Sequence, residues 1–451
     1  MNGPGYEHGH GRDHDPGREK RPRGLLVPAL LTLVLLSCST IPDTTIGFLD
    51  VKVAAPSRDV DVPLASPIEL PSLLSGIPLE EISITLQESG GSGSTVPGQL
   101  ELDKEGEPRL WCVLPHTDGD RAQPWRVLLS LEPDANGFVW RDGPEGSRDL
   151  YLGERRVLRY ACAFDASTPE RLEATYKPYH HAFDATGENL LTKGTGGLYS
   201  HHRGIFIGWN RLTFEGREVD SWHMRGITQR HRAVLMEVTG PVLARSKVLV
   251  DWTLDDGRTV IAEQREVTVY RQSAPRVLLL DFNTRLAAPN GAVLLNGDAE
   301  HGGFQFRAHN DVAGRDAASE DNATRAGPNA PAAGAVVAGQ GKASYIFPAD
   351  GIDPTKVVDL PWVAMTYELN GRRYTVQHMN HPGNPKNTLY SAYRDYGRFG
   401  AFFVHEISKG ETLELRYRIR ITEGETPARE DFEAAYASFV SPPTFQDLPA
   451  P

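Results

Sequence analysis

Short runs in which apolar and polar residues alternate fill most of the chain after its first 40 positions. This period-two pattern is typical of strands that bury one face. Glycine-rich clusters, such as residues 90–94, separate the runs and favour tight turns. The pattern predicts strands over residues 82–86, 125–131, 234–238, 246–254, 259–270, 276–283, 343–347, 362–369, 373–378, 399–404 and 412–422.

Helical spacing is confined to the end of the chain. Thr426 before Pro427 is a helix-start signal, and residues 429–439 have the apolar spacing of a helix. No repeat of about 20 to 50 residues is present, which disfavours a propeller. The predicted fold is therefore all-β: a large antiparallel β-sandwich, or supersandwich, with an N-terminal β module and a short C-terminal helix.

Changes in composition suggest where these parts begin and end. We expect the β module over residues 47–160, the sandwich over residues 161–425, and the helix and tail over residues 426–451. Residues 314–341 are rich in Ala, Gly, Asn and Asp and have almost no large apolar side chain. Such a segment is expected to form an exposed loop.

The N-terminus has the order of a secretory signal. A polar stretch ends in a basic cluster, and an apolar run over residues 25–36 follows directly. That run is shorter than the roughly 20 residues of a membrane-spanning helix. Leu35-Leu36-Ser37-Cys38 resembles the lipobox of bacterial lipoproteins, in which the cysteine is acylated. We expect a signal peptide over residues 1–37, a lipidated linker over residues 38–46, and a membrane-anchored protein at the outer membrane or the periplasmic face.

Charge and cysteine content narrow the partners. The formal net charge is −12, and no basic run occurs outside the signal, so nucleic acid is not an expected partner. After the candidate lipidation site at Cys38, only Cys112 and Cys162 remain. In an oxidising compartment this pair is a candidate disulfide, and the alternative is two buried thiols. Both alternatives stay open because the sequence does not give the distance between the two Cα atoms that a bridge requires.

Histidines gather in the second part of the chain. Ten of the fifteen lie between residues 180 and 381. Several stand beside other polar residues, as in His201-His202-Arg203-Gly204 and Glu300-His301-Gly302-Gly303. An acid and an imidazole together can transfer protons. We predict catalytic roles for His202, Glu300 and His301, with Glu300 as base and one imidazole as acid, and substrate contacts from the following residues: Arg203, Trp222, His223, His381 and Arg398.

Two further chemistries fit the same region. Aromatic and planar polar side chains can stack on sugar rings and hydrogen-bond hydroxyls, and the candidates are Trp209, Trp222, Tyr390, Tyr393, Tyr396, Arg394 and Arg398. For any one of these residues alone, a structural role, as a core aromatic residue or a surface arginine, is an adequate interpretation. Several imidazoles with Glu300 could also bind zinc or iron, although the sequence has no His-Glu-x-x-His. The cofactor is therefore left undetermined.

Five motifs occur in an order that resembles the PmoA-like family, a bacterial family of unknown function often labelled "methane oxygenase PmoA". They are His201-His202-Arg203-Gly204, Glu300-His301-Gly302-Gly303, Trp362-Val363-Ala364-Met365, His381-Pro382-Gly383-Asn384-Pro385 and Asp395-Tyr396-Gly397-Arg398-Phe399-Gly400. The resemblance covers roughly residues 47–425. It implies an architecture related to galactose mutarotase-like supersandwiches, which bind or process sugars with a histidine and a carboxylate. Because fold does not fix function, this link is an analogy.

Three hypotheses for function follow. The first is a carbohydrate-binding or carbohydrate-processing lipoprotein with a His/Glu/Arg pocket. The second is a non-catalytic surface lipoprotein that binds glycans or proteins, and the third is a metal-dependent oxygenase or hydrolase. A carbohydrate or other small molecule is the expected ligand, and the membrane is contacted through the lipid anchor.

Overall fold

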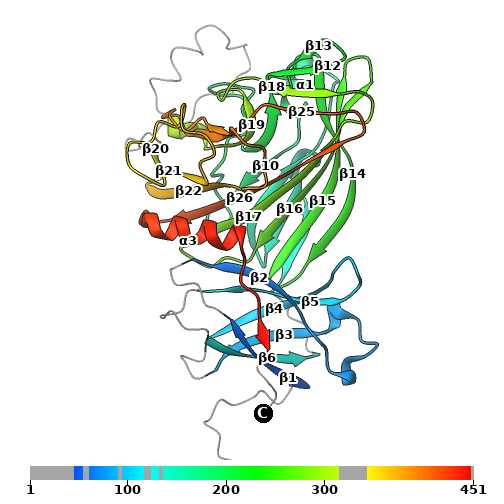
Figure 1. Cartoon of the computed structure of the whole chain (residues 1–451), viewed down its shortest axis with the longest axis vertical. Helices are drawn as coiled ribbons and strands as arrows, with labels where there is room; N and C mark the ends of the chain where they lie inside the picture. Colours follow the sequence, from blue (N-terminus) through cyan, green and yellow to red (C-terminus); the bar gives the residue numbers. More distant parts are fainter. Residues whose placement is uncertain are drawn as a thin grey trace, which may run out of the picture. The chain divides into compact units, whose positions relative to one another are not determined.

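The computed structural model describes residues 45–53, 60–89, 94–115, 123–131, 136–313 and 343–447 (Figure 1). The predicted signal peptide with Cys38 lies outside the described residues, as does the predicted loop over residues 314–341. Both predictions therefore stay predictions. The described residues belong to one compact unit.

Strands dominate the described residues, which confirms the all-β prediction. The strand pairs in the described residues are antiparallel, and they assemble into four sheets. The helical segments are short: α1 (Pro169–Thr175), α3 (Arg429–Val440), and the 3-10 turns η1 (Ser72–Leu74), η2 (Leu79–Glu81), η3 (Pro144–Gly146) and η4 (Asn310–Ala313). No helix in the described ranges has both the length and the apolar character needed to cross a bilayer.

The N-terminal sheet has the strand order β2-β5-β4-β3-β6-β1-β27. Its inward positions, among them Leu86, Leu110, Trp125 and Val127, are fully buried in a core of their own. This is the outcome expected of alternating strands, because successive side chains point to opposite faces. The strands are β1 (Gly47–Val53), β2 (Val62–Pro67), β3 (Ser83–Glu88), β4 (Thr95–Leu102), β5 (Pro108–Leu114), β6 (Gln123–Ser130) and β27 (Gln446–Asp447).

One sheet of the large body has the order β23-β24-β19-β11-β10-β9-β8-β7. Its strands are β7 (Phe138–Asp142), β8 (Arg148–Leu152), β9 (Arg155–Ala161), β10 (Tyr179–Ala182), β11 (Ile205–Trp209), β19 (Gly302–Arg307), β23 (Leu389–Tyr390) and β24 (Arg398–Phe402). We expected residues 138–160 in the N-terminal module, but β9 pairs with β10, and Leu150 and Leu158 are buried in the sandwich core. Strand pairing therefore places the end of the module after β6.

The facing sheet has the order β14-β15-β16-β17-β26-β22-β21-β20, and its long strands lie side by side in Figure 1. Phe304 of the first sheet packs against Phe282 and Tyr417 of the second, with ring centroids 4.4 and 4.6 Å apart, so the two sheets share one core. The strands are β14 (Ile227–Thr239), β15 (Leu243–Leu254), β16 (Thr259–Tyr270), β17 (Arg276–Ala287), β20 (Ser344–Ile346), β21 (Trp362–Leu369), β22 (Arg372–Asn380) and β26 (Thr412–Glu423).

A smaller sheet of four strands in the described residues has the order β13-β12-β18-β25. Phe214 and Leu295 of this sheet are buried with the sandwich core. Its strands are β12 (Arg211–Phe214), β13 (Arg217–Val219), β18 (Val293–Asn296) and β25 (His405–Ile407).

The C-terminal helix is confirmed, but its start differs from the prediction. Helix α3 begins at Arg429, so Thr426 does not cap it. The Asp431 carboxylate accepts a hydrogen bond of 3.0 Å from the Ala428 N–H instead. Phe432 on this helix packs against Trp362 of β21, with ring centroids 5.1 Å apart. The helix is thereby anchored to the sandwich.

The candidate disulfide is not formed, because both cysteines are free thiols in the structure. Cys112 lies on β5 in the core of the N-terminal sheet, whereas Cys162 follows β9 in another sheet and donates to the Gly146 carbonyl. Burial raises the pKa of both thiols, to about 11 for Cys162. Neither is an activated thiolate at neutral pH.

A fully buried ion pair lies between the two large sheets. Glu263 of β16 accepts hydrogen bonds from Arg265 at 2.8 and 3.0 Å, from Trp252 at 2.8 Å and from Thr284 at 3.0 Å. Arg265 also donates to the Pro178 carbonyl, just before β10 of the facing sheet, at 3.1 Å. Every polar atom of the carboxylate is thus paired, as a buried charge requires.

Replacing Glu263 tests the importance of this pair. Glu263→Gln leaves the Arg265 guanidinium buried without an anion, so we expect a loss of about 3–5 kcal/mol in the free energy of unfolding, measured by urea denaturation. The control is Glu266→Gln on the same strand, whose side chain is 26% exposed and lies 3.7 Å from Lys247, with an expected loss below about 1 kcal/mol. Equal losses would contradict a special role for Glu263.

Candidate functional site

The structure brings together histidines from three separate segments. His201 and His202 precede β11, His223 follows β13, and His301 directly precedes β19. The ring of His201 lies 4.2 Å from that of His223, which lies 5.3 Å from that of His301. We call these four residues the histidine cluster. The predicted residues His202, His223 and His301 are therefore neighbours, and His201 joins them.

The local backbone explains why these segments meet. Strand β11 pairs with β19, and the N–H of Asn210 donates to the His301 carbonyl at 2.9 Å. The N–H of Ser221 donates to the Trp209 carbonyl at 2.9 Å, which holds the turn after β13 over β11. Any side chain at Gly208 would meet the Ser221 carbonyl oxygen at 2.5 Å, so this close approach requires glycine.

Two of the histidines are each held by an aspartate. Asp220 Oδ2 lies 2.7 Å from His223 Nδ1, and Asp298 Oδ1 lies 2.9 Å from His301 Nδ1. Burial raises the pKa of both carboxyl groups. Hydrogen bonds lower it by more, chiefly the bond from His223 to Asp220 and the bond from Asn210 to Asp298. The pKa of each carboxyl group is therefore below its ordinary value. An ionised carboxylate fixes the proton on Nδ1 and leaves Nε2 for other partners.

Neither aspartate was among the predicted site residues. Both stand three positions before their histidine, in Asp220-Ser-Trp-His223 and Asp298-Ala-Glu-His301. In each turn the aspartate also accepts a backbone N–H, from His223 at 2.8 Å and from Glu300 at 3.1 Å. The repeated Asp-x-x-His spacing was the sequence signal that could have identified them.

Glu300 lies beside the cluster, but its carboxylate is already engaged. Oε1 accepts from the Tyr393 hydroxyl at 2.6 Å, and Oε2 pairs with Arg394 at 2.5 Å. The Tyr393 hydrogen bond, against a smaller effect of burial, lowers the pKa of Glu300. This arrangement favours a role in positioning Tyr393 and Arg394 over the predicted role as base.

His202 is only 2% exposed and forms a wall of the site. Its ring lies 5.8 Å from that of Trp222 and 6.1 Å from that of Tyr396. Burial, and then the charge of neighbouring groups, lowers the pKa of His202 well below its ordinary value, so the imidazole is neutral. A neutral buried imidazole does not suit the predicted role as acid, which falls more naturally to His223 or His301.

The predicted substrate-binding arginines are also buried. Arg398 donates to Gln305 Oε1 and to Ser391 Oγ, both at 3.2 Å, and its guanidinium lies 5.6 Å from the Trp222 ring. Arg203 donates to the Glu173 carbonyl at 2.6 Å. Both arginines therefore lie behind the rings of the site rather than on its surface.

His381 is not brought to the cluster. It follows β22 in the facing sheet, its Nδ1 accepts the Gly383 N–H at 3.0 Å, and its ring lies 5.5 Å from that of Phe439 on α3. Strand β22 belongs to the opposite sheet of the sandwich, so these contacts give no support to a shared site, and the predicted role of His381 stays a prediction.

Most of the predicted sugar-stacking aromatics are core residues. Trp209, Trp222 and Tyr390 are fully buried, whereas Tyr393 is 39% exposed beside Glu300. No group of three or more His, Cys, Asp or Glu side chains within the described ranges has the arrangement of a metal site. The metal-dependent hypothesis stays a prediction.

Two lysines are buried beside the cluster. Lys177 donates to the Trp222 carbonyl at 2.6 Å, and Lys193 donates to the carbonyls of Gly194 at 3.0 Å and His202 at 3.4 Å. Burial, and then the charges of Arg203 and Arg307, lowers the pKa of Lys193 to about 6. Burial also lowers the pKa of Lys177 well below its ordinary value.

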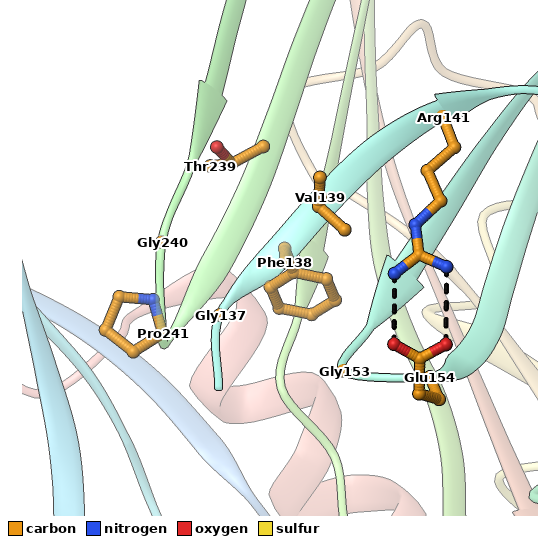
Figure 2. Close-up of a pocket in the computed structure, with 9 residues that line it drawn as sticks. All are labelled: Gly137, Phe138, Val139, Arg141, Gly153, Glu154, Thr239, Gly240 and Pro241. Atoms are coloured by element: carbon orange, nitrogen blue, oxygen red, sulfur yellow. Dashed lines mark hydrogen bonds and ion pairs between the residues drawn. The ribbon is translucent and has the colours of Figure 1, made fainter. Parts of the chain in front are cut away.

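A surface hollow of about 330 Å³ lies elsewhere, at the turns next to β7, β8 and β14 (Figure 2). Its charged residues, Arg141 and Glu154, face each other and form two hydrogen bonds of 3.2 and 3.4 Å. The rest of its lining is Gly137, Phe138, Val139, Gly153, Thr239, Gly240 and Pro241. Because the two charges neutralise each other, this hollow offers less chemistry than the histidine cluster.

Residues 147–437 match a protein family described as a family of unknown function, DUF6807. The chain belongs to this family. The matched region of the DUF6807 chain includes the whole histidine cluster and both aspartates, but it does not include the N-terminal sheet. No curated protein matches the chain.

The buried lysine gives a pH-dependent prediction. Between pH 6 and the ordinary pKa of lysine, Lys193 is protonated in the unfolded chain and deprotonated in the folded protein. The contribution of Lys193 to the free energy of unfolding therefore rises with pH across this window. Lys193→Met removes this dependence. The stability of the variant relative to the wild type should therefore fall by up to about 1 kcal/mol per pH unit from pH 6.5 to 9, measured by urea denaturation.

The control is Lys356→Met, at a lysine whose side chain is 81% exposed. Its stability relative to the wild type should be constant over the same pH range. If Lys193→Met is equally constant, the lysine is protonated in the folded protein at neutral pH.

Proposed function

We propose that this DUF6807 protein binds a carbohydrate at the histidine cluster and catalyses an acid–base reaction on it. The observation that carries the proposal is the pair of aspartate-held imidazoles, His223 and His301, with ring centroids 5.3 Å apart. Both side chains are partly exposed, at 20% and 34%, so a ligand can reach them.

The chemistry needs two proton-transfer groups. Opening a sugar ring requires a base that removes the proton of the anomeric hydroxyl and an acid that protonates the ring oxygen as its bond to the anomeric carbon breaks. Ring closure reverses both transfers, so each imidazole returns to its first state. His223 and His301 fit these roles because a carboxylate on Nδ1 directs Nε2 to the ligand and stabilises the imidazolium.

Other residues would orient the sugar. Tyr393 and Arg394, held by Glu300, form a partly exposed rim that can bond to hydroxyl groups. The ring of Trp222 lies 6.0 Å from that of His301 and supplies apolar packing next to the imidazoles. This division of roles agrees with an apolar surface and a few fixed polar groups, as in other small-molecule sites.

Sequence resemblance adds to the proposal. The PmoA-like motifs and the analogy with galactose mutarotase-like sandwiches favour a sugar as ligand. The lipobox-like Leu35-Leu36-Ser37-Cys38 favours an exported lipoprotein that is anchored through Cys38 and meets glycans at the cell surface or in the periplasm.

A glycan-binding protein without catalysis is the second candidate. It is favoured by Glu300, whose carboxylate is paired with Tyr393 and Arg394 and is not free to act as a base. The two candidates differ in turnover and not in binding.

Turnover and binding can be measured separately. We expect one or more reducing sugars to raise the melting temperature by mass action and to change anomer faster with the protein present, as followed by polarimetry. Asp298→Asn and His301→Gln should lower this rate by about 10²- to 10⁴-fold with binding retained. The control is His405→Gln on β25, a histidine packed on Phe403. Binding with no turnover would establish the second candidate, and no binding would refute both.

A further inference from the structure

Three arginines and two lysines are buried around the histidine cluster. Their exposed fractions lie between 0% and 2%, and the residues are Arg203, Arg307, Arg398, Lys177 and Lys193. The three guanidinium groups are cations, and such charges are expensive to remove from water unless an anion compensates them.

The hydrogen-bond partners of these five side chains are neutral oxygens. Arg307 donates to the carbonyls of Ala308, at 3.1 Å, and of Tyr396, and its Nε and Nη2 atoms have no partner in the part of the chain that the structure describes. Arg203 and the two lysines likewise donate to backbone carbonyls. Among the described residues, none of the three arginines has a carboxylate within ion-pair distance.

Two other buried arginines of the same sandwich are compensated. Arg265 pairs with Glu263 at 2.8 Å, and Arg418 pairs with Asp281 at 2.5 Å. Arg159, which is 16% exposed, pairs with Asp149 at 2.7 Å. The three arginines around the histidine cluster differ from these positions. The chain as a whole is acidic, with a formal net charge of −12.

The five basic side chains surround one group of aromatic rings. The His202 carbonyl accepts from Arg203 at 2.9 Å and from Lys193 at 3.4 Å. The Trp222 ring has Arg398 at 5.6 Å and Lys177 at 5.9 Å. Arg307 lies 5.0 Å from the ring of Tyr396, whose hydroxyl accepts from Arg398 at 3.2 Å.

The same rings carry buried nitrogen atoms that have no hydrogen-bond partner within the described residues: His201 Nε2, His202 Nδ1 and Trp222 Nε1. His202 and Trp222 are at least 98% buried, and both lie next to His201 or to each other. Buried polar atoms without partners are rare and call for an explanation, such as a ligand. Oxygen atoms of a ligand placed against these rings would satisfy them.

We propose that the ligand of this site carries an anionic group, and that the substrate is therefore an acidic sugar bearing a carboxylate or a sulfate. This inference rests on the proposed carbohydrate function, and it names the substrate class. The three guanidinium groups, which lie behind the rings of the site, supply the compensating positive field. Tyr393 and Arg394 at the rim bond to the sugar hydroxyls.

The test compares matched ligands on the unmodified protein by calorimetry at low salt. The probes are glucuronate, its neutral amide glucuronamide, glucose, glucose 6-sulfate and inorganic sulfate. We expect at least one of the two acidic sugars to bind 10-fold or more tightly than glucose, and glucuronate to lose this advantage as its amide. The preference should decline with added salt, because screening weakens charge interactions.

Variants provide a second readout. Arg398→Gln should reduce the ratio of acidic to neutral sugar affinity by about 10-fold. The matched control is Arg245→Gln, whose arginine is 16% exposed and pairs with Glu101 at 2.6 Å, and which should retain the ratio. The ligand comparison on the wild-type protein needs no variant and holds even if one variant fails to fold.

The outcomes separate the two proposals. Equal binding of glucuronate, glucuronamide and glucose overturns the anionic-substrate inference and leaves the carbohydrate function in place. Binding of inorganic sulfate without any sugar supports the anion site and overturns the carbohydrate function. If neither the acidic sugars nor inorganic sulfate bind, the inference is wrong.

Discussion

The buried pair of Glu263 and Arg265 is the interaction on which the sandwich depends most directly. The carboxylate joins β15, β16 and β17 through Trp252, Arg265 and Thr284, and the guanidinium reaches the carbonyl of Pro178, just before β10 of the facing sheet. Apolar packing alone is not directional, so it permits neighbouring registers of similar energy. A charge that is satisfied in only one arrangement selects one alignment of the two sheets.

The rule that a buried charge needs a compensating partner also applies to the candidate site. At two positions of the sandwich a buried arginine has its anion: Arg265 has Glu263, and Arg418 has Asp281. Around His202 the cations have carbonyl and hydroxyl partners instead, and the carboxylates nearby serve other groups: Asp220 and Asp298 hold histidines, and Glu300 holds Tyr393 and Arg394. Burying charge without an anion costs free energy, and this cost is the physical basis of the proposed anionic ligand.

The site is built on turns that rigid strands position. His301 begins β19, and His223 lies in a turn that is hydrogen-bonded over β11, so both imidazoles are fixed by backbone pairing and by their own aspartates. Loops on a rigid scaffold commonly carry function, because their side chains can vary without loss of the core. The family match includes this whole arrangement and leaves out the N-terminal sheet, which has a separate core.

The sequence by itself determined the all-β class, most strands and the C-terminal helix, because alternation and helical spacing are local properties of the chain. It also placed the site near the histidine-rich segments, and His202, His223 and His301 do meet. Only the tertiary structure decided that His381 lies in the opposite sheet, that Glu300 is engaged, that β7 to β9 join the sandwich and that Asp220 and Asp298 hold the imidazoles. These facts depend on strand order and on contacts between segments far apart in the chain, which local patterns do not encode.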